Sequence, residues 1–202
     1  KPDRFHWPRY YTLARHFEPR ETMRTAVDLF KEEGMPTNPI CVDLGCGNGV
    51  DTLYLLEHGW QVLAIDSSEE GLDELKQKIP TALRHNLELQ HAPMESTSLP
   101  TCHFINASFS LPFCAEDDFG LLWNRMGRRL KKGGRFAGQF FGPNDTWATV
   151  DNRTLHFDKD AVMRLLHGFE IEHFEEKETD SFDATGAPKH WHVFHVVARK
   201  KA

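Results

Sequence analysis

The chain has 202 residues, which suits one domain with a substantial core, and its hydrophobic content of 40% excludes a disordered chain. The formal net charge of −6 argues against a nucleic-acid partner, because phosphates select a basic surface. No stretch approaches the roughly 20 apolar residues of a membrane span, and no signal peptide opens the chain. The four cysteines form no CxxC pair and fit no zinc motif. We therefore expect a cytoplasmic protein without a membrane partner, whose oligomeric state the sequence does not indicate.

Predicted helices and strands alternate along the amino-terminal half, which is the order of an α/β protein with a parallel sheet. Apolar residues at helical spacing and short apolar runs distinguish the two kinds of element. Ser67 or Ser68 is placed to cap the third helix. The predicted elements are a helix over 19–33, a strand over 40–44, a helix over 50–58, a strand over 61–65, a helix over 68–79 and a strand over 87–91.

The carboxyl-terminal half continues this alternation and ends in two strands. The elements are a strand over 104–108, a helix over 116–131, a strand over 135–141, a helix over 158–167, and strands over 169–175 and 191–199. The linker over 177–188 has no helical pattern, so the last two strands are expected to pair antiparallel. Basic residues that end the helix over 116–131 most simply complement its macrodipole; they are Arg128, Arg129, Lys131 and Lys132.

A glycine loop between the first predicted strand and its helix points to a ligand. It carries glycine at positions 45, 47 and 49, and glycine lets the backbone approach a bound nucleotide closely. A dinucleotide fingerprint needs glycine or alanine at the sixth position, where this chain has Val50. Asp43 before the loop is a poor neighbour for a pyrophosphate but suits the α-amino group of a methionine moiety. No GxxxxGK[ST] sequence is present, so a P-loop is excluded.

Asp66 ends the second predicted strand, 21 residues after Gly45, where an acidic group can accept both hydroxyls of a ribose. Asp66 alone is equally well explained as a helix N-cap. For the loop alone, a tight turn without a ligand is the less favoured alternative. The combination of Asp43, the three glycines and Asp66 favours a site for a nucleoside that carries a charged amino-acid tail.

On these residues the chain resembles the class I S-adenosylmethionine-dependent methyltransferases, and the resemblance covers nearly its whole length. The family's first motif looks like Val42–Gly49, its strand-two acid like Asp66, and its adenine-contacting segment like Ala92–Glu95. Its fourth motif resembles Phe104–Phe109, and its fifth-strand region resembles Lys132–Phe141. Within the family the chain looks most like the small tellurite-resistance-type members.

The resemblance implies a Rossmann-like three-layer sandwich with a seven-stranded, mostly parallel sheet of order 3-2-1-4-5-7-6, in which strand seven is antiparallel. Residues 1–202 then form a single methyltransferase domain, with a cap segment and helix over 1–35 and the Rossmann-like core over 36–202. The implied cofactor is S-adenosyl-L-methionine and the product S-adenosyl-L-homocysteine. The implied cofactor-binding residues are Asp43, Gly45, Cys46, Gly47, Asn48, Gly49, Asp66, Ser67, Met94, Glu95, Asn106, Ala107 and Ser108.

The fourth motif departs from the pattern of family members that methylate amide or ring amino nitrogens. Those enzymes often carry Asn/Asp-Pro-Pro-aromatic, whereas this chain has Ala107 and Ser108 between Asn106 and Phe109. The departure puts methylation of DNA bases or glutamine amides in doubt. A plain alternative for Asn106 is that it only caps a strand end.

Three aromatic-rich segments are candidates to close over the methyl acceptor; they are 5–11, 109–113 and 141–147. In-line methyl transfer requires a placed nucleophile and a site that excludes water, whereas a base is needed only for a protonated nucleophile. We therefore assign no catalytic residue. The candidate substrate contacts are Trp7, Tyr11, Phe109, Phe113, Trp147 and His190. Packing in the core or a lid explains the rings Trp7, Phe113 and Trp147 equally well.

Histidines gather on the last predicted strand, where His190 and His192 share one face and His195 lies on the other. No carboxylate or cysteine falls at a strand-compatible spacing beside them, so we predict no metal site. We expect one histidine to reach the mouth of the site. The acidic residues over 175–183 are expected to form a solvated face of a hairpin loop.

The sequence thus predicts an S-adenosylmethionine-dependent methyltransferase with a small-molecule acceptor. Two alternatives stay open: a protein that binds the cofactor without turning it over, and a methyltransferase that acts on protein or nucleic acid. The glycine loop is expected to contact only the methyl donor, so it does not indicate the acceptor or its nucleophilic atom.

Overall fold

Seven strands form one sheet in the computed structural model, which describes residues 18–150, 154–183 and 185–201. The strands are β1 (Ile40–Leu44), β2 (Gln61–Asp66), β3 (Leu87–His91), β4 (Cys102–Ala107), β5 (Leu130–Phe141), β6 (Phe169–Phe182) and β7 (Pro188–Lys200). The helices are α2 (Glu21–Glu33), α3 (Val50–Glu57), α4 (Glu69–Lys78), α5 (Glu116–Arg129), α6 (Thr146–Val150) and α7 (Lys159–Leu165). Three short 3-10 turns are η1 (Thr81–Asn86), η2 (Met94–Ser96) and η3 (Leu111–Phe113).

The sheet order is β3-β2-β1-β4-β5-β7-β6, which confirms the order that the resemblance implied. Strands β1 to β5 are parallel to one another, while β7 runs antiparallel to both β5 and β6. Because β7 is antiparallel, its first residues lie at the same edge of the sheet as the carboxyl ends of β1, β2 and β4. Ligands of open α/β sheets bind at this edge.

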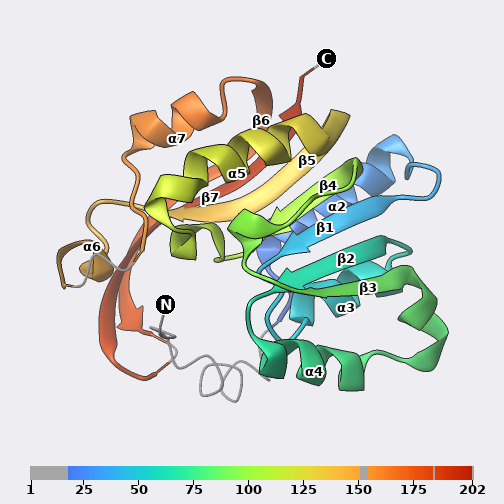
Figure 1. The fold of residues 1–202 in the computed structure, drawn as a ribbon. Coiled ribbons are helices and arrows are strands. Elements are labelled where there is room, and N and C mark those ends of the chain that lie inside the picture. The colour runs from blue at the N-terminus through green and yellow to red at the C-terminus, as the bar shows by residue number, and fades with distance from the viewer. Residues whose placement is uncertain (1–17, 151–153, 184, 202) are drawn as a thin grey trace.

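Helices cover both faces of the sheet, with α2 and α3 behind it and α5 and α7 in front of it in the view of Figure 1. The rear face buries a cluster that joins Met23 and Phe30 of α2 to Leu55 of α3 and Phe104 of β4. The front face buries a second cluster, in which Phe119 and Leu122 of α5 pack against the central strands. Apolar burial on both faces, at about 25 cal/mol per Å², explains why the central strands are nearly continuous apolar runs.

The long hairpin of β6 and β7 differs from the predicted pair of short strands. β6 extends to Phe182 and β7 begins at Pro188, so most of the predicted linker over 177–188 is paired strand. The acidic residues over 175–182 therefore belong to a strand rather than to a loop. Strand β5 begins at Leu130, earlier than the predicted start at Arg135, so Gly133 and Gly134 lie within the strand. The pairing of β5 with β4 is irregular over this stretch. The structure further adds α6 and the 3-10 turns, which were not predicted.

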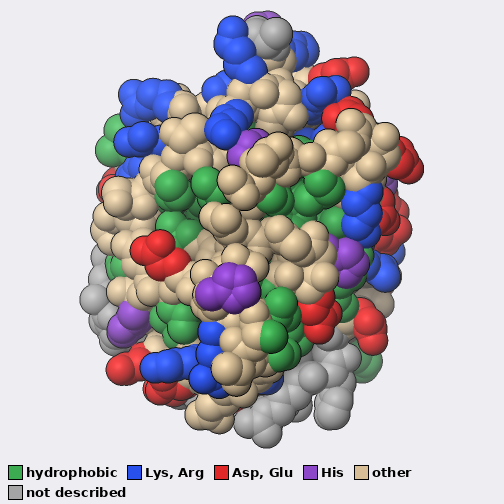
Figure 2. All heavy atoms as spheres, turned by 90° about the vertical axis from the view of Figure 1, so that its right-hand side faces the viewer, with side chains coloured by type: hydrophobic (Ala, Val, Ile, Leu, Met, Phe, Trp, Pro, Cys, Tyr) green, Lys and Arg blue, Asp and Glu red, His purple; other side chains and the backbone are tan. Residues whose placement is uncertain are grey.

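The basic end of α5 lies where the sequence placed it, with Arg128 and Arg129 in the last turn. Figure 2 shows the side of the molecule on the right of Figure 1, where the parallel strands begin, and Lys and Arg side chains gather at its top. This side is opposite the carboxyl ends of the parallel strands. In the part of the chain that the structure describes, no helix has the length and apolar character needed to span a membrane.

Candidate functional site

Two buried carboxylates lie at the carboxyl end of β1. Asp43 is the last residue but one of the strand, and Asp51 comes from the first turn of α3; they are 1% and 8% exposed. The side-chain amide of Asn106 on β4 donates to both, at 2.9 Å from Asp43 Oδ1 and 3.1 Å from Asp51 Oδ2. Thr52 Oγ1 donates to Asp43 at 2.5 Å. Arg20 N donates to Asp51 Oδ1 at 2.9 Å. Burial and the neighbouring Asp51 charge raise the pKa of Asp43 to about 7.

Asp66 joins the end of β2 to the glycine loop. Its carboxylate accepts hydrogen bonds from the backbone N–H of Gly47, at 2.7 Å, and from that of Ser68, at 2.8 Å. Ser68 caps α4 by accepting from Gly71 N, which confirms one of the two predicted capping residues.

Two loop glycines are required by close packing. A Cβ at Gly45 would lie 2.4 Å from the Cβ of Ser110, whose Oγ donates to the carbonyl of Leu44. A Cβ at Gly49 would lie 2.1 Å from Leu75 of α4. Both residues also have positive φ, at 71° and 81°. The loop is therefore fixed tightly between α4 and the segment that follows β4.

The remaining predicted cofactor contacts surround this loop. Cys46 and Asn48 belong to it, and burial raises the pKa of Cys46 well above its usual range. Ser67 is exposed just after β2, and its carbonyl lies 3.0 Å from His91 Nε2. Met94 reaches toward the loop, with Cε 3.7 Å from where a Gly45 Cβ would lie.

Two further segments complete the predicted cofactor set. Arg125 of α5 holds the Met94–Ser96 turn by donating to the carbonyl of Glu95 at 2.8 Å and to that of Thr97. Ala107 ends β4 fully buried, and Ser108 Oγ donates to Asn106 Oδ1 at 3.1 Å. The predicted cofactor residues thus lie along the carboxyl ends of β1, β2 and β4 and in the turn after β3.

An aromatic cluster lies beside them, over the ends of β4, β5 and β7. Phe141 is its centre, with ring centroids 6.3 Å from Phe109, 6.2 Å from Phe113 and 5.9 Å from Trp147. Trp191 of β7 joins it, 5.9 Å from Phe141. Three of the predicted substrate contacts, Phe109, Phe113 and Trp147, are therefore brought together. Trp7 and Tyr11 lie outside the described residues.

A buried ion pair contacts two rings of the aromatic cluster. Lys189 and Asp145 are 3% and 0% exposed and are bonded to each other. The Lys189 ammonium lies 4.1 Å from the ring centre of Trp147 and 4.0 Å from that of Trp191. Burial lowers the pKa of Lys189, and the bond to Asp145 opposes that shift. The pair positions two indole rings of the cluster.

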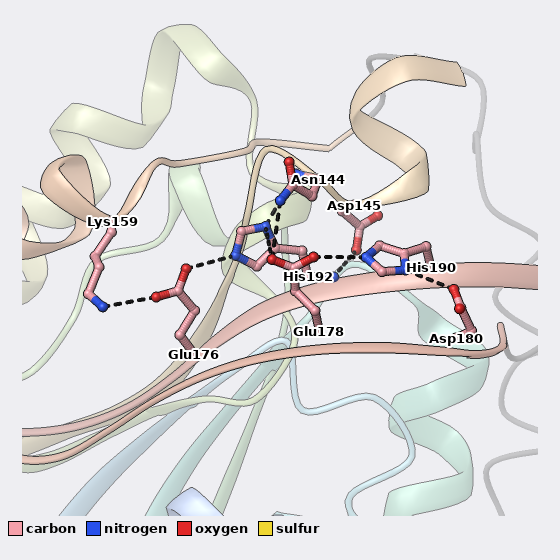
Figure 3. Close-up of polar contacts among 8 residues, drawn as sticks. All are labelled: Asn144, Asp145, Lys159, Glu176, Glu178, Asp180, His190 and His192. Atoms are coloured by element: carbon pink, nitrogen blue, oxygen red, sulfur yellow. Dashed lines mark hydrogen bonds and ion pairs between the residues drawn. The ribbon is translucent and has the colours of Figure 1, made fainter.

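His190 lies on the other face of β7 from Trp191 and apart from the aromatic cluster. Figure 3 shows it between Asp180 and Glu178. His190 Nδ1 lies 2.8 Å from Asp180 Oδ1, and His190 Nε2 lies 3.0 Å from Glu178 Oε2. His192 lies next to it, 3.2 Å from Glu176 and from the backbone N–H of Asn144. The expectation that no carboxylate stands beside these histidines was wrong, because the partners come from β6 across the hairpin. Even so, no group of three potential ligands among the described residues is arranged to hold a metal ion.

Sequence reasoning missed several residues of the site. Asp51 and Ser110 have no signal of their own, since each matters through a partner that is distant in the sequence. Trp191 and His195 were separable from His190 by the alternation of strand faces, but the sequence did not show which face meets Phe109. The Lys189–Asp145 pair joins β7 to the loop after β5 and has no sequence pattern.

Comparison with known proteins agrees with this geometry. Residues 41–134 match the family model described as a methyltransferase domain. A Magnesium-protoporphyrin O-methyltransferase of Rhodobacter capsulatus is 31% identical over 112 residues, which are 55% of this chain and 50% of that protein. A Trans-aconitate 2-methyltransferase of an Acidovorax species is 35% identical over 98 residues, or 48% of this chain and 37% of that protein. The matches thus span half or less of the length of these curated relatives.

Among solved structures, TehB from Haemophilus influenzae superposes with a TM-score of 0.70 at 18% identity, over 96% of this chain and 67% of that one. At this identity the likeness concerns the fold, and it extends beyond the segment that the family model matches. Residues 41–134 are thus similar to a methyltransferase domain, and the fold of the chain is similar to that of TehB.

Proposed function

We propose that this chain transfers the methyl group of S-adenosylmethionine to a small-molecule acceptor. The observation that carries the proposal is the position of two acids around one loop. Asp43 lies one residue before the end of β1, and Asp66 ends β2 and bonds to the loop. An ammonium group beside Asp43 and Asp51 would compensate two buried carboxylates that repel each other. Ribose hydroxyls would donate hydrogen bonds to the carboxylate of Asp66. Both groups occur in S-adenosylmethionine.

The other residues take roles that follow from their positions. Met94 and Glu95 would border the adenine, and Asn106, Ala107 and Ser108 the methionine end. The loop residues Cys46, Asn48 and Gly49 and the exposed Ser67 would line the nucleoside between them. When bound, the sulfonium supplies an electrophilic methyl carbon; the protein's part is to orient it and to exclude water.

Three observations support a small-molecule acceptor. The names of two relatives specify small acceptors, Mg-protoporphyrin and trans-aconitate. The basic side chains of α5 lie at the opposite edge of the sheet from the site, where they cannot guide a nucleic acid to it. The aromatic cluster around Phe141 places apolar side chains beside the predicted cofactor residues, and such side chains predominate in small-ligand sites. The four free cysteines also support a reducing, cytoplasmic location.

Replacement of Asp66 by alanine is expected to weaken cofactor binding at least tenfold, or about 1.4 kcal/mol. The variant loses the ribose acceptor and also the bond that holds Gly47. Calorimetric titration with S-adenosylmethionine and S-adenosylhomocysteine measures the effect, with micromolar affinity expected for the native protein. Asp73→Ala, on the exposed surface of α4, removes the same charge and is the matched control. If titration of the folded native protein with S-adenosylmethionine released or absorbed no heat, the proposal would be refuted.

Turnover separates the proposal from a protein that binds the cofactor without using it. Labelled S-adenosylmethionine offered with a broad set of small acceptors is expected to yield labelled product from at least one of them. Tight cofactor binding with no product from any acceptor would favour the binding protein. A nucleic acid or protein that purifies with the chain and accepts the label would favour a macromolecular substrate.

A further inference from the structure

Three rings converge next to Ser108, which is proposed to border the methionine end of the cofactor. Phe109 follows β4 directly after Ser108, and its ring centroid lies 5.9 Å from that of His195 and 6.3 Å from that of Trp191. Both contacts are edge-to-face, at interplanar angles of 76° and 85°. Trp191 and His195 are four residues apart on β7, so they project from the same face of the sheet. The rings therefore reach across β5 from the two strands that flank it.

The imidazole of His195 is the least engaged of the three on β7. Both ring nitrogens of His190 are hydrogen-bonded to carboxylates, and those of His192 are hydrogen-bonded to Glu176 and to the backbone N–H of Asn144. By contrast, the nitrogens of His195 make no hydrogen bond to any residue in the described ranges, and the side chain is partly exposed. A ring with a free lone pair in an aromatic pocket is suited to accept a proton.

The charges that face His195 come from two elements. Glu175, Lys177 and His173 lie on β6, and Glu21 begins α2. Burial lowers the pKa of His195, with Lys177 and His173 adding to the shift and Glu175 and Glu21 opposing it. The imidazole is therefore neutral at neutral pH, which is the form of a base.

His195 is also connected to Phe109 through Gln139. Gln139 is its direct cross-strand partner on β5, and Gln139 Oε1 accepts from the backbone N–H of Phe109 at 2.8 Å. Gln139 Nε2 donates to Thr22 Oγ1 at 2.8 Å, which fixes the amide orientation. These bonds hold the turn at Phe109, whose φ of 53° is unusual for a residue with a side chain. The positions of Phe109 and His195 are therefore set together.

We infer that Phe109, Trp191 and His195 form the acceptor subsite, that the acceptor is a planar aromatic or heteroaromatic molecule with an N–H or O–H nucleophile, and that His195 is its general base. This inference rests on the proposed function. In the step, the nucleophile's lone pair forms the bond to the methyl carbon, and the carbon–sulfur bond breaks with its electron pair returning to sulfur. The acceptor's proton passes to a ring nitrogen of His195 and then to water. A thiolate acceptor would leave the base without a role.

The test compares two probes of the same shape, 2-naphthol and 2-naphthalenethiol, at pH 8. His195→Gln is expected to lower kcat for the naphthol at least a hundredfold, which is within the range for loss of a general base. The thiol is largely ionised at this pH, so its kcat should fall less than threefold. The KM for S-adenosylmethionine should not change in either case. His167→Gln, an exposed substitution after α7, is the matched control.

A measurement on the native protein keeps the inference testable if the variant folds poorly. The imidazole Cε1–H resonance of His195 should titrate with a pKa below the ordinary 6.5 and shift when 2-naphthol is added with S-adenosylhomocysteine. The native pH–rate profile for the naphthol should share that inflection. Equal losses for both probes, an unshifted resonance, or transfer to the thiol alone would overturn the assignment. With the cofactor bound, transfer to neither probe would overturn the acceptor class, whereas failure to bind the cofactor would refute the proposed function itself.

Discussion

Replacing Lys189 with methionine is expected to lower the free energy of unfolding by about 3–5 kcal/mol, the cost of leaving one member of a buried ion pair uncompensated. Asp145 is fully buried and accepts from Trp147 N at 3.0 Å and His192 N at 3.3 Å as well as from the ammonium. The methionine side chain fills the space between Trp147 and Trp191 but leaves the Asp145 charge without a cation. For a chain of this size the loss corresponds to a fall in melting temperature of about 10 °C.

The matched control is Lys159→Met, which also breaks a pair of lysine with a carboxylate. Lys159 lies 2.9 Å from Glu176, but its side chain is 58% exposed, so its loss should cost less than about 1 kcal/mol. Adding Asp145→Asn to Lys189→Met removes the uncompensated charge and should restore about half of the lost stability. Denaturant unfolding of the four proteins measures these differences. Similar losses for Lys189→Met and Lys159→Met would contradict the buried-pair account.

The central fold was predictable because its signals are local. Short apolar runs separated by helical stripes identified β1, β2 and β4, and the glycines with Asp43 identified the nucleotide-binding turn. The strand order, however, came from the family resemblance. No periodicity in a strand states which strand lies beside it. The antiparallel pairing of the last two strands was inferred from the absence of a helical pattern between them, and this is confirmed.

The far half of the hairpin was not predictable for a physical reason. From Glu175 to Ser181 the residues of β6 are exposed and mostly charged, so no alternation of apolar and polar residues marks the strand. The segment is held by backbone pairing and by partners on β7, such as His190 opposite Asp180. Such cross-strand pairs appear in a sequence only after the register is known. The same limit hid the carboxylates beside His190 and His192.

The residues proposed to bind the methyl donor could be predicted from the sequence, whereas those proposed to contact the acceptor could not. Asp43 and Asp66 occupy fixed positions relative to the glycine loop, so one short segment of sequence places both. Phe109, Trp191 and His195 come from elements that are more than 80 residues apart, and their proximity depends on β7 lying next to β5. This difference explains why the acceptor could not be inferred from motifs.

Replacing Asp43 with asparagine is expected to weaken cofactor binding at least tenfold while stabilising the ligand-free protein at alkaline pH. The asparagine keeps an oxygen for the Asn106 amide and an NH₂ group that can face the Thr52 hydroxyl. It removes the negative charge that repels Asp51 and that would attract the cofactor's ammonium. The two effects have opposite signs, which a general disruption of the loop would not produce.

The pH dependence follows from the carboxyl group. Its pKa is about 7 in the folded chain against an ordinary value of 3.8, so between these values the folded state keeps a proton that the unfolded chain has released. Stability therefore falls as the pH rises from about 4 to about 7, and the loss is complete above that. The variant carries no such proton. Its melting temperature should match that of the native protein near pH 4 and exceed it by several degrees at pH 8.

Cofactor binding should reverse this proton uptake, because an ammonium beside Asp43 favours the ionised carboxylate. Near pH 6.5 the native protein is expected to release a proton on binding S-adenosylmethionine, and the Asp43→Asn variant much less. Calorimetry in two buffers with different ionisation enthalpies measures that release. Asp73→Asn, an equal change of charge on the exposed surface of α4, should alter neither affinity nor proton release. Native affinity in Asp43→Asn would place the ammonium elsewhere. A melting temperature with the same pH dependence as the native protein would instead show that Asp43 is already ionised in the fold, and that Asn106 and Thr52 suffice to stabilise two adjacent charges.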